Sequence, residues 1–278
     1  MVERSRKGFY ETITDAVRYF TEHGFVSAER LEFWVKEIRL AAERSMIPPH
    51  VMEQQLRATF GSVYRRMVER GGMAKYHPGV GRFTLQQVAP RLRAELDRRI
   101  LASSQLIKLN RAEAIEKTIR RFSGWATSIP AGGSENVDKR EIKDDVRKAL
   151  ASLPFEMRRV HVDQGHKFIA SLNGILAKDG GAIAGRWVDR GTSDAHYKAR
   201  PEHKAWSDRK AVFLIRDSWA QKAGLVKPSK DGYTDDIEAP GELVYCSCHY
   251  VFLYNLRQLP PEMLTAKGKE ALERAKVA

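Results

Sequence analysis

Two cysteines and two histidines in the second half of the 278-residue chain could together bind a metal ion. Cys246 and Cys248 are separated by one residue, and His196 and His203 lie seven positions apart upstream of them. Two thiolates and two imidazoles are the ligand set of a closed tetrahedral zinc site, with bonds of about 2.0–2.3 Å. On a strand, side chains two positions apart point to the same face, so the cysteines would supply half of the site. The sequence therefore predicts a structural zinc ion at His196, His203, Cys246 and Cys248.

An alternative is that the cysteines are small buried apolar residues and that the two histidines lie at the surface. A disulfide between the cysteines is not expected, because residues two apart hold their Cα atoms near the limit that a disulfide permits. Free thiols and metal ligands are both compatible with a reducing compartment. His161, His166 and His249 are spare candidate ligands, and a structural role is predicted for each of them.

Basic residues are concentrated in one part of the chain. The net charge is +13, and residues 51–123 hold 15 Lys and Arg against 6 Asp and Glu, whereas residues 201–250 hold 7 against 8. A local basic excess favours a polyanionic partner, with nucleic acid first, although a solvated helical face has the same composition. The predicted phosphate contacts are Arg65, Arg66, Arg82 and Arg91.

Signatures of several enzyme classes are missing from the sequence. The glycine-rich segment 180–186 is followed by Trp187, and Arg186 and Trp187 stand where a phosphate loop needs Lys and Ser or Thr. The sequence contains no H-E-x-x-H or G-x-S-x-G motif, and its C-x-C differs from the C-x-x-C of zinc deaminases. None of these enzyme classes is therefore indicated, and the closed zinc site predicted above favours a structural, non-enzymatic protein.

The first half of the chain has the pattern of a helical region. Apolar residues recur at helical spacing in residues 9–20 and again in residues 31–42, and Ser27 is a candidate N-cap between them. A third helix is expected from Pro48 to about Arg70, before two glycines. Residues 84–122 are expected to form one helix, roughly 55–60 Å long at about 1.5 Å per residue. These elements predict an elongated N-terminal helical region.

The second half is expected to combine helices with a few short strands. Residues 129–134, rich in Gly with one Pro, are the predicted domain boundary. Asp138 is expected to cap a helix, and another helix is expected from Pro154 to Asp179. Apolar and aromatic runs in residues 182–190 and 243–253 predict strands. The predicted fold class is α+β and predominantly helical, with a helical basic region at 1–130, a small α+β domain at 131–260 and a helical tail at 261–278.

The sequence does not predict association with a membrane. No apolar run approaches the roughly 20 residues that span a bilayer. Residues 1–20 mix acidic and basic side chains instead of forming the apolar core of a signal peptide. Synthesis in the cytoplasm is therefore the default expectation.

Residues 157–250 resemble the phage minor head, or head morphogenesis, family typified by the F protein of phage Mu. The family pattern has a helix, a tryptophan at a strand, the motif D-x-R-x-R-x-x-H, an acidic loop with Pro and Gly, and a closing C-R-C. Trp187 fits the tryptophan, residues 200–203 fit the end of the motif, and residues 240–241 and 246–248 fit the loop and the closing cysteines. His196 stands where the family has Asp, an exchange that keeps a metal ligand. Lys198 and Ser247 stand where the family has arginines.

The resemblance implies a structural minor head protein of a tailed bacteriophage, made in the host cytoplasm and located in the head interior or at the portal vertex. The implied partners are the portal protein, the major capsid protein and packaged double-stranded DNA. The basic helical half would face DNA, and a metal-stapled domain would dock on protein.

Two other functions stay open. One is a zinc-dependent nuclease or hydrolase, which would need a metal-bound water and a general base such as Asp194, Glu202 or Asp208. The other is a bacterial DNA-binding protein with no role in a virion.

Overall fold

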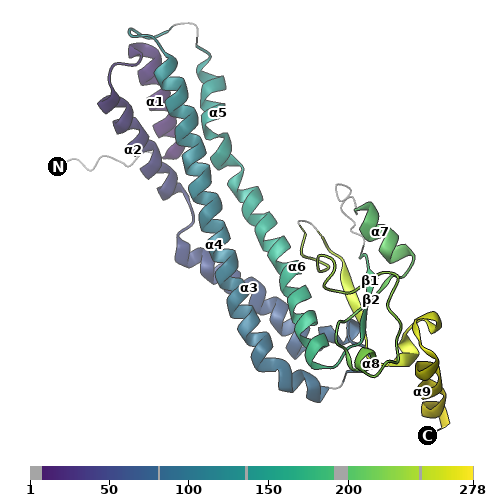
Figure 1. The fold of residues 1–278 in the computed structure, drawn as a ribbon. Coiled ribbons are helices and arrows are strands. Elements are labelled where there is room, and N and C mark those ends of the chain that lie inside the picture. Colours follow the sequence, from purple (N-terminus) through teal and green to yellow (C-terminus); the bar gives the residue numbers. More distant parts are fainter. Residues whose placement is uncertain (1–7, 81, 135–136, 191–199, 244–245, 278) are drawn as a thin grey trace. The chain divides into compact units, whose positions relative to one another are not determined.

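A computed structural model describes residues 8–80, 82–134, 137–190, 200–243 and 246–277 (Figure 1). Helices make up the N-terminal region, and a small three-stranded antiparallel sheet with short helices follows, which confirms the predicted α+β class. The α-helices are α1 (Phe9–His23), α2 (Ala28–Ser45), α3 (Pro49–Tyr64), α4 (Arg82–Ser128), α5 (Lys139–Ala151), α6 (Leu153–Asp179), α7 (Pro201–Asp208), α8 (Trp219–Lys222) and α9 (Ala266–Val277). The strands are β1 (Ala184–Val188), β2 (Val212–Leu214) and β3 (His249–Leu253). Short 3-10 or π-helical turns cover Arg65–Glu69, Gly72–Lys75, Leu256–Gln258 and Pro261–Met263.

The chain forms two compact units, each assembled from two separate stretches of sequence. The first unit combines Met1–Gln55 with Ala102–Val160, and the second combines Leu56–Leu101 with His161–Ala278. Helices α4 and α6 therefore contribute residues to both units. The domain ranges 1–130, 131–260 and 261–278 stay a prediction.

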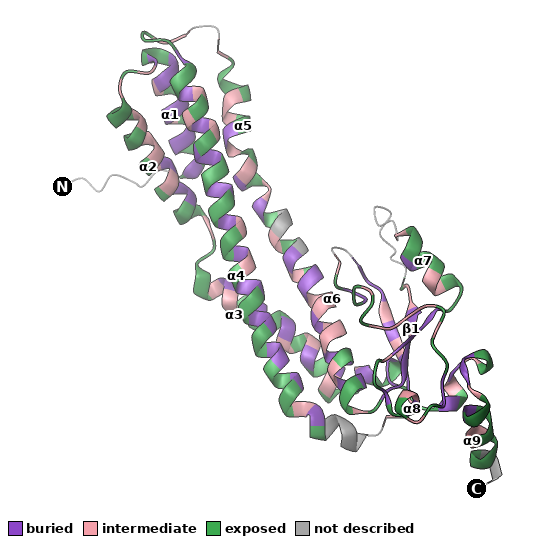
Figure 2. Cartoon of the chain, viewed as in Figure 1, coloured by how far each residue is buried: buried purple, intermediate pink, exposed green. Residues whose placement is uncertain are grey.

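The first unit is a helical bundle with an aromatic centre. Phe20 of α1 is fully buried and lies edge-on to Phe122 of α4, with ring centroids 5.6 Å apart. The pattern of burial follows the helix faces in Figure 2, as expected for amphipathic helices.

Two predicted helix caps are confirmed. The Ser27 side chain accepts a hydrogen bond from the Arg30 amide. The Asp138 side chain accepts hydrogen bonds from the amides of Arg140 and Glu141.

The second unit contains the sheet, in the order β2-β1-β3. Trp187 on the central strand is buried and pairs in register with Tyr250 of β3. Position 185 requires glycine because the Tyr250 ring lies over it. A Cβ atom at this position would come within 2.8 Å of the ring. Strands β1 and β3 fall within the predicted runs, whereas the sequence reasoning did not predict β2.

The segment before α4 is anchored to the sheet through a buried histidine. The Phe252 amide donates to the carbonyl oxygen of Tyr76 at 2.8 Å. His77 is 1% exposed, stacks on the Phe252 ring and hydrogen-bonds through its two ring nitrogens to Tyr254 and Asn173. Burial lowers the pKa of His77 to about 4, so the ring is neutral near pH 7.

Within the described residues, no helix is both long and apolar enough to cross a membrane.

Candidate metal centre

His203, Cys246 and Cys248 come together in the second unit, although His203 is more than forty positions from the cysteines. His203 lies in the first turn of α7, which begins at Pro201, a residue whose fixed φ favours that position. The cysteines lie just before β3. All three residues are buried, with exposed fractions of 5% for His203, 1% for Cys246 and 5% for Cys248.

The distances in this cluster match those of a tetrahedral metal site. His203 Nδ1 lies 3.6 Å from Cys246 Sγ and 3.6 Å from Cys248 Sγ, and the three atoms are within 4.8 Å of one another. Bonds of about 2.3 Å to sulfur and about 2.0–2.1 Å to nitrogen, at a tetrahedral angle, separate sulfur from nitrogen by about 3.5–3.6 Å. The buried cluster of His203, Cys246 and Cys248 could therefore hold a metal ion such as zinc.

The surrounding backbone and aromatic rings hold the cluster in place. The Gly241 amide donates to Cys246 Sγ at 3.3 Å, from a left-handed conformation (φ +84°) that favours glycine. The Trp187 ring lies edge-on to His203 at a centroid distance of 4.8 Å, and the Trp206 ring stacks on it at 5.5 Å. These contacts fix the direction in which His203 presents its Nδ1 atom.

The two cysteines have opposite pKa shifts. A hydrogen bond from Cys248 and another from the Gly241 amide lower the pKa of Cys246, against the effect of burial. The hydrogen bond to Cys246 and burial raise the pKa of Cys248. A lowered pKa favours the thiolate form that binds metals, and a bound cation would favour loss of the second proton.

The fourth predicted ligand, His196, lies outside the described residues. The structure instead brings the Asp189 carboxylate next to the cluster: Asp189 Oδ1 is 3.7 Å from Cys248 Sγ, and the Asp189 amide donates to Ser207 Oγ. Asp189 is not among the atoms that lie within 4.8 Å of one another, so it would have to turn to become a ligand. The sequence reasoning missed Asp189, although its position directly after β1 and two residues from Trp187 was a usable signal.

The four arginines predicted to bind phosphates have different surroundings. Arg65 and Arg66 are exposed at adjacent positions in the π-helical turn after α3. Arg91 is exposed on α4 but is paired with the Asp179 carboxylate. The Arg82 side chain lies outside the described residues. The spare histidines are partly buried, and burial lowers the pKa of His161, His166 and His249.

Comparison of the chain with protein-family models, with curated proteins and with solved structures finds no match.

Proposed function

We propose that the chain is a structural minor head protein of a tailed bacteriophage, associated with the portal or the inner capsid, and not an enzyme. In this role it acts in head morphogenesis and in handling packaged DNA. It is made in the host cytoplasm and ends in the virion, at the head interior or the portal vertex. Its partners are the portal protein, the major capsid protein and double-stranded DNA.

One observation carries this proposal: the residues on which the family resemblance rests meet in one buried cluster. Trp187 packs on His203, His203 faces Cys246 and Cys248, and the Gly241 amide bonds Cys246. These residues are spread over about a quarter of the sequence, and unrelated surface residues would have no reason to converge. The convergence supports a shared structural purpose for the motif residues.

In the proposed protein, the metal is a structural zinc that joins α7 to the segment before β3. A three-stranded sheet with one short strand buries a modest core, so a staple between distant segments adds stability that the core lacks. Four protein ligands would close the site to water, with His196 or Asp189 as the fourth. Replacing each of these two residues with alanine, in turn, and measuring zinc affinity would identify the ligand.

Co-purification with head proteins tests the proposed function. We expect the full chain, co-expressed with the portal protein and the major capsid protein of the same phage, to purify in a complex with the portal. The variant His203→Ala should associate less, because the docking domain would lose its staple. Failure to associate with either protein at every salt concentration tried would contradict the proposal.

A zinc-dependent nuclease or hydrolase is the second candidate, and one observation favours it. Within the described residues three side chains surround the metal position, which is the number found in catalytic zinc sites, and Cys248 also lines a cleft. Glu202 and Asp208 on α7 are exposed and could act as general bases, whereas Asp194 lies outside the described residues. Zinc-loaded protein that cleaves DNA, with loss of cleavage in Glu202→Gln or Asp208→Asn, would support this candidate. Bound zinc without turnover supports the structural role.

A further inference from the structure

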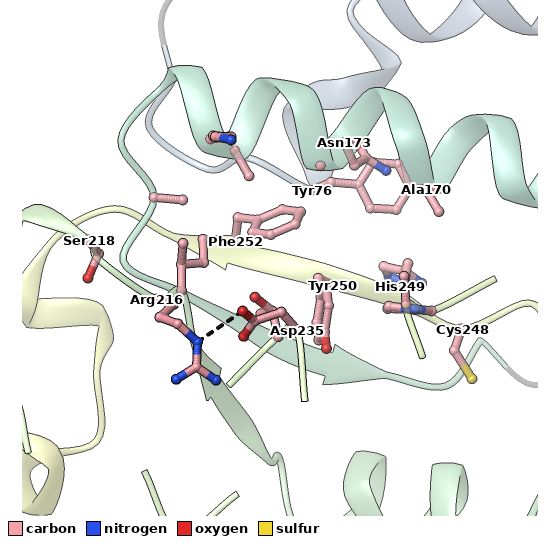
Figure 3. A pocket seen from close by; sticks show the side chains of 18 of the residues that line it. Tyr76, Ala170, Asn173, Arg216, Ser218, Asp235, Cys248, His249, Tyr250 and Phe252 are labelled. Atoms are coloured by element: carbon pink, nitrogen blue, oxygen red, sulfur yellow. Dashed lines mark hydrogen bonds and ion pairs between the residues drawn. The ribbon is translucent and has the colours of Figure 1, made fainter. Parts of the chain in front are cut away.

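A cleft of about 730 Å³ opens in the second unit between α6 and the sheet (Figure 3). Ala170 and Asn173 of α6 line one side, and Tyr250 and Phe252 of β3 line the other. The volume is within the range of about 300–1,000 Å³ that is typical of small-molecule sites. Nothing in the metal cluster or in the proposed role in the phage head requires such a cleft.

Small residues on α6 keep the cleft open. Ala170, Gly174 and Ala177 recur at helical spacing along the wall. A Cβ atom added at Gly174 would meet no atom within 4 Å, so the space beside this residue is not filled by packing. Glycine inside a helix costs about 0.5–1 kcal/mol relative to alanine, so this open space comes at some expense of stability.

Several buried polar atoms along the cleft have no hydrogen-bond partner among the described residues. They are the hydroxyl oxygens of Ser218, Ser247 and Tyr250 and the Nδ1 atoms of His166 and His249. The three hydroxyl residues are each more than nine-tenths buried. An unpaired buried polar atom destabilises a fold by about 1–3 kcal/mol, so the residues around the cleft are not arranged for stability alone.

Charged and aromatic side chains at the cleft indicate which molecule it would take. Four basic side chains line it (Lys178, Arg190, Arg216 and Lys222) against two acidic ones. Arg216 is paired with Asp235 and Asp236, whereas no ion pair engages Lys178, Arg190 or Lys222 in the described part of the chain. Trp219, in the same helix as Lys222, is 45% exposed and lines the cleft, so its indole face is available to stack on a planar ring.

From these observations we infer that the cleft is a binding site for a small anionic molecule with an aromatic ring, of the class of the mononucleotides. Lys178 and Lys222 provide positive charge for the phosphate, and Trp219 provides a stacking surface for the ring. This inference does not depend on the proposed function.

Calorimetric titration of the purified full chain with adenosine monophosphate tests the inference. We expect adenosine monophosphate to bind at least tenfold more tightly than adenosine or inorganic phosphate, because each of these lacks one of the two recognised groups. No measurable heat at millimolar adenosine monophosphate would overturn the inference. Equal binding of inorganic phosphate would overturn the role given to Trp219 and with it the ligand class.

Two variants locate the binding site and separate it from folding defects. Gly174→Leu should lower the affinity at least tenfold by filling the cleft, while Gly124→Leu, at an equally open and exposed helical position in the first unit, should leave it unchanged. Trp219→Ala should weaken binding about tenfold while the melting temperature changes little, because Trp219 is 45% exposed and supplies the stacking surface. Wild-type affinity in both Gly174→Leu and Trp219→Ala would place the ligand elsewhere and refute the assignment.

Discussion

Single side chains decide the chemistry of the metal centre. Cys246 and Cys248 are one residue apart, and Ser247 between them is buried. His203 completes the cluster from a different element, and its Nδ1 atom is equally far from both sulfurs. If a metal ion binds in this cluster, these three side chains would be its ligands.

Replacement of one cysteine is expected to abolish tight zinc binding. Cys246→Ser should reduce the zinc content of the purified protein, measured by elemental analysis, from about one ion per chain to a small fraction of that. Ser247→Ala is the matched control, because it changes the residue between the ligands and should keep the full zinc content. Equal zinc content in both variants would rule out the cysteines as ligands.

Because of His77, the free energy of unfolding is expected to decrease in mildly acidic solution. Its pKa is about 4 in the fold and about 6.5 in the unfolded chain, so the unfolded state takes up its proton first as the pH falls. The stability that His77 contributes is complete above pH 6.5 and declines between pH 6.5 and 4, by at most about 3 kcal/mol. Urea unfolding across this range should show a shallower pH dependence for His77→Gln than for the wild type. The exposed-site control His50→Gln should keep the wild-type slope, and an unchanged slope in His77→Gln would contradict this account.

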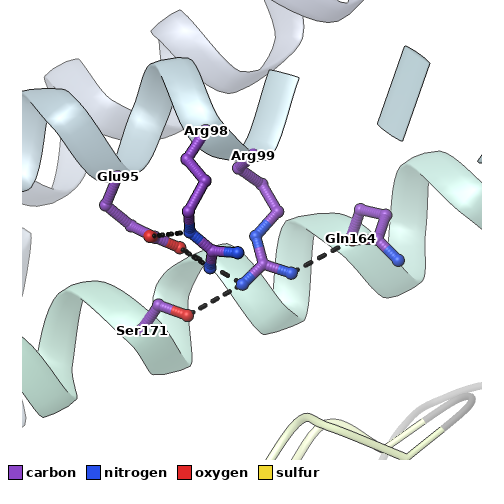
Figure 4. Close-up of polar contacts among 5 residues, drawn as sticks. All are labelled: Glu95, Arg98, Arg99, Gln164 and Ser171. Atoms are coloured by element: carbon purple, nitrogen blue, oxygen red, sulfur yellow. Dashed lines mark hydrogen bonds and ion pairs between the residues drawn. The ribbon is translucent and has the colours of Figure 1, made fainter. Parts of the chain in front are cut away.

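At the scale of elements, a buried polar network joins α4 to α6 within the second unit (Figure 4). Arg99 donates to Glu95 on its own helix and to Gln164 and Ser171 on α6, at 2.9–3.2 Å. Glu95 also accepts two hydrogen bonds from Arg98. Glu95 and Arg99 are 7% and 8% exposed. At this degree of burial, each charge is stabilised by the opposite charge of the other residue.

Removing the charge of Glu95 is expected to destabilise the protein by about 3 kcal/mol, because the buried guanidinium of Arg99 would lose the carboxylate on its own helix. Burial raises the pKa of Glu95, but the hydrogen bonds and positive charges of Arg98 and Arg99 outweigh burial and lower it. The contribution of the carboxylate is therefore complete above pH 4.5 and is lost as the pH falls through the lowered pKa. Urea unfolding of Glu95→Gln should show the full deficit at pH 7 and a smaller one in acid. Glu113→Gln, which breaks the exposed pair with Lys117 on the same helix, should change stability little.

Local sequence patterns predicted most of the helices, because spacing and caps act within a few residues. The caps at Ser27 and Asp138 and the long helix α4 are confirmed. Strand β2 was missed, since three residues are too few to show an alternating pattern. The burial of His77 was also missed, because it depends on contacts with Asn173 and Tyr254, which are distant in sequence. Three residues of the candidate metal site could be predicted from the sequence, because histidine and cysteine are common metal ligands.

At the scale of the whole molecule, the net charge of +13 is the property that bears most directly on the proposed DNA partner. Binding to DNA through phosphates is expected to be independent of sequence and to weaken steeply with salt. In titrations of duplex DNA, Arg65→Ala combined with Arg66→Ala should reduce the slope of log affinity against log salt by up to about 2. Arg209→Ala, which removes an arginine already paired with Asp231, is the control and should leave the slope unchanged. An unchanged slope in the double variant would place the DNA contacts elsewhere on the chain.

X-ray absorption spectroscopy of the purified full chain at the zinc edge tests whether His203, Cys246 and Cys248 bind the proposed structural zinc ion. We expect two sulfur neighbours at about 2.3 Å and two nitrogen or oxygen neighbours at about 2.0–2.1 Å. A zinc ion surrounded only by nitrogen and oxygen, or protein that retains no zinc after purification in its presence, would contradict this proposal.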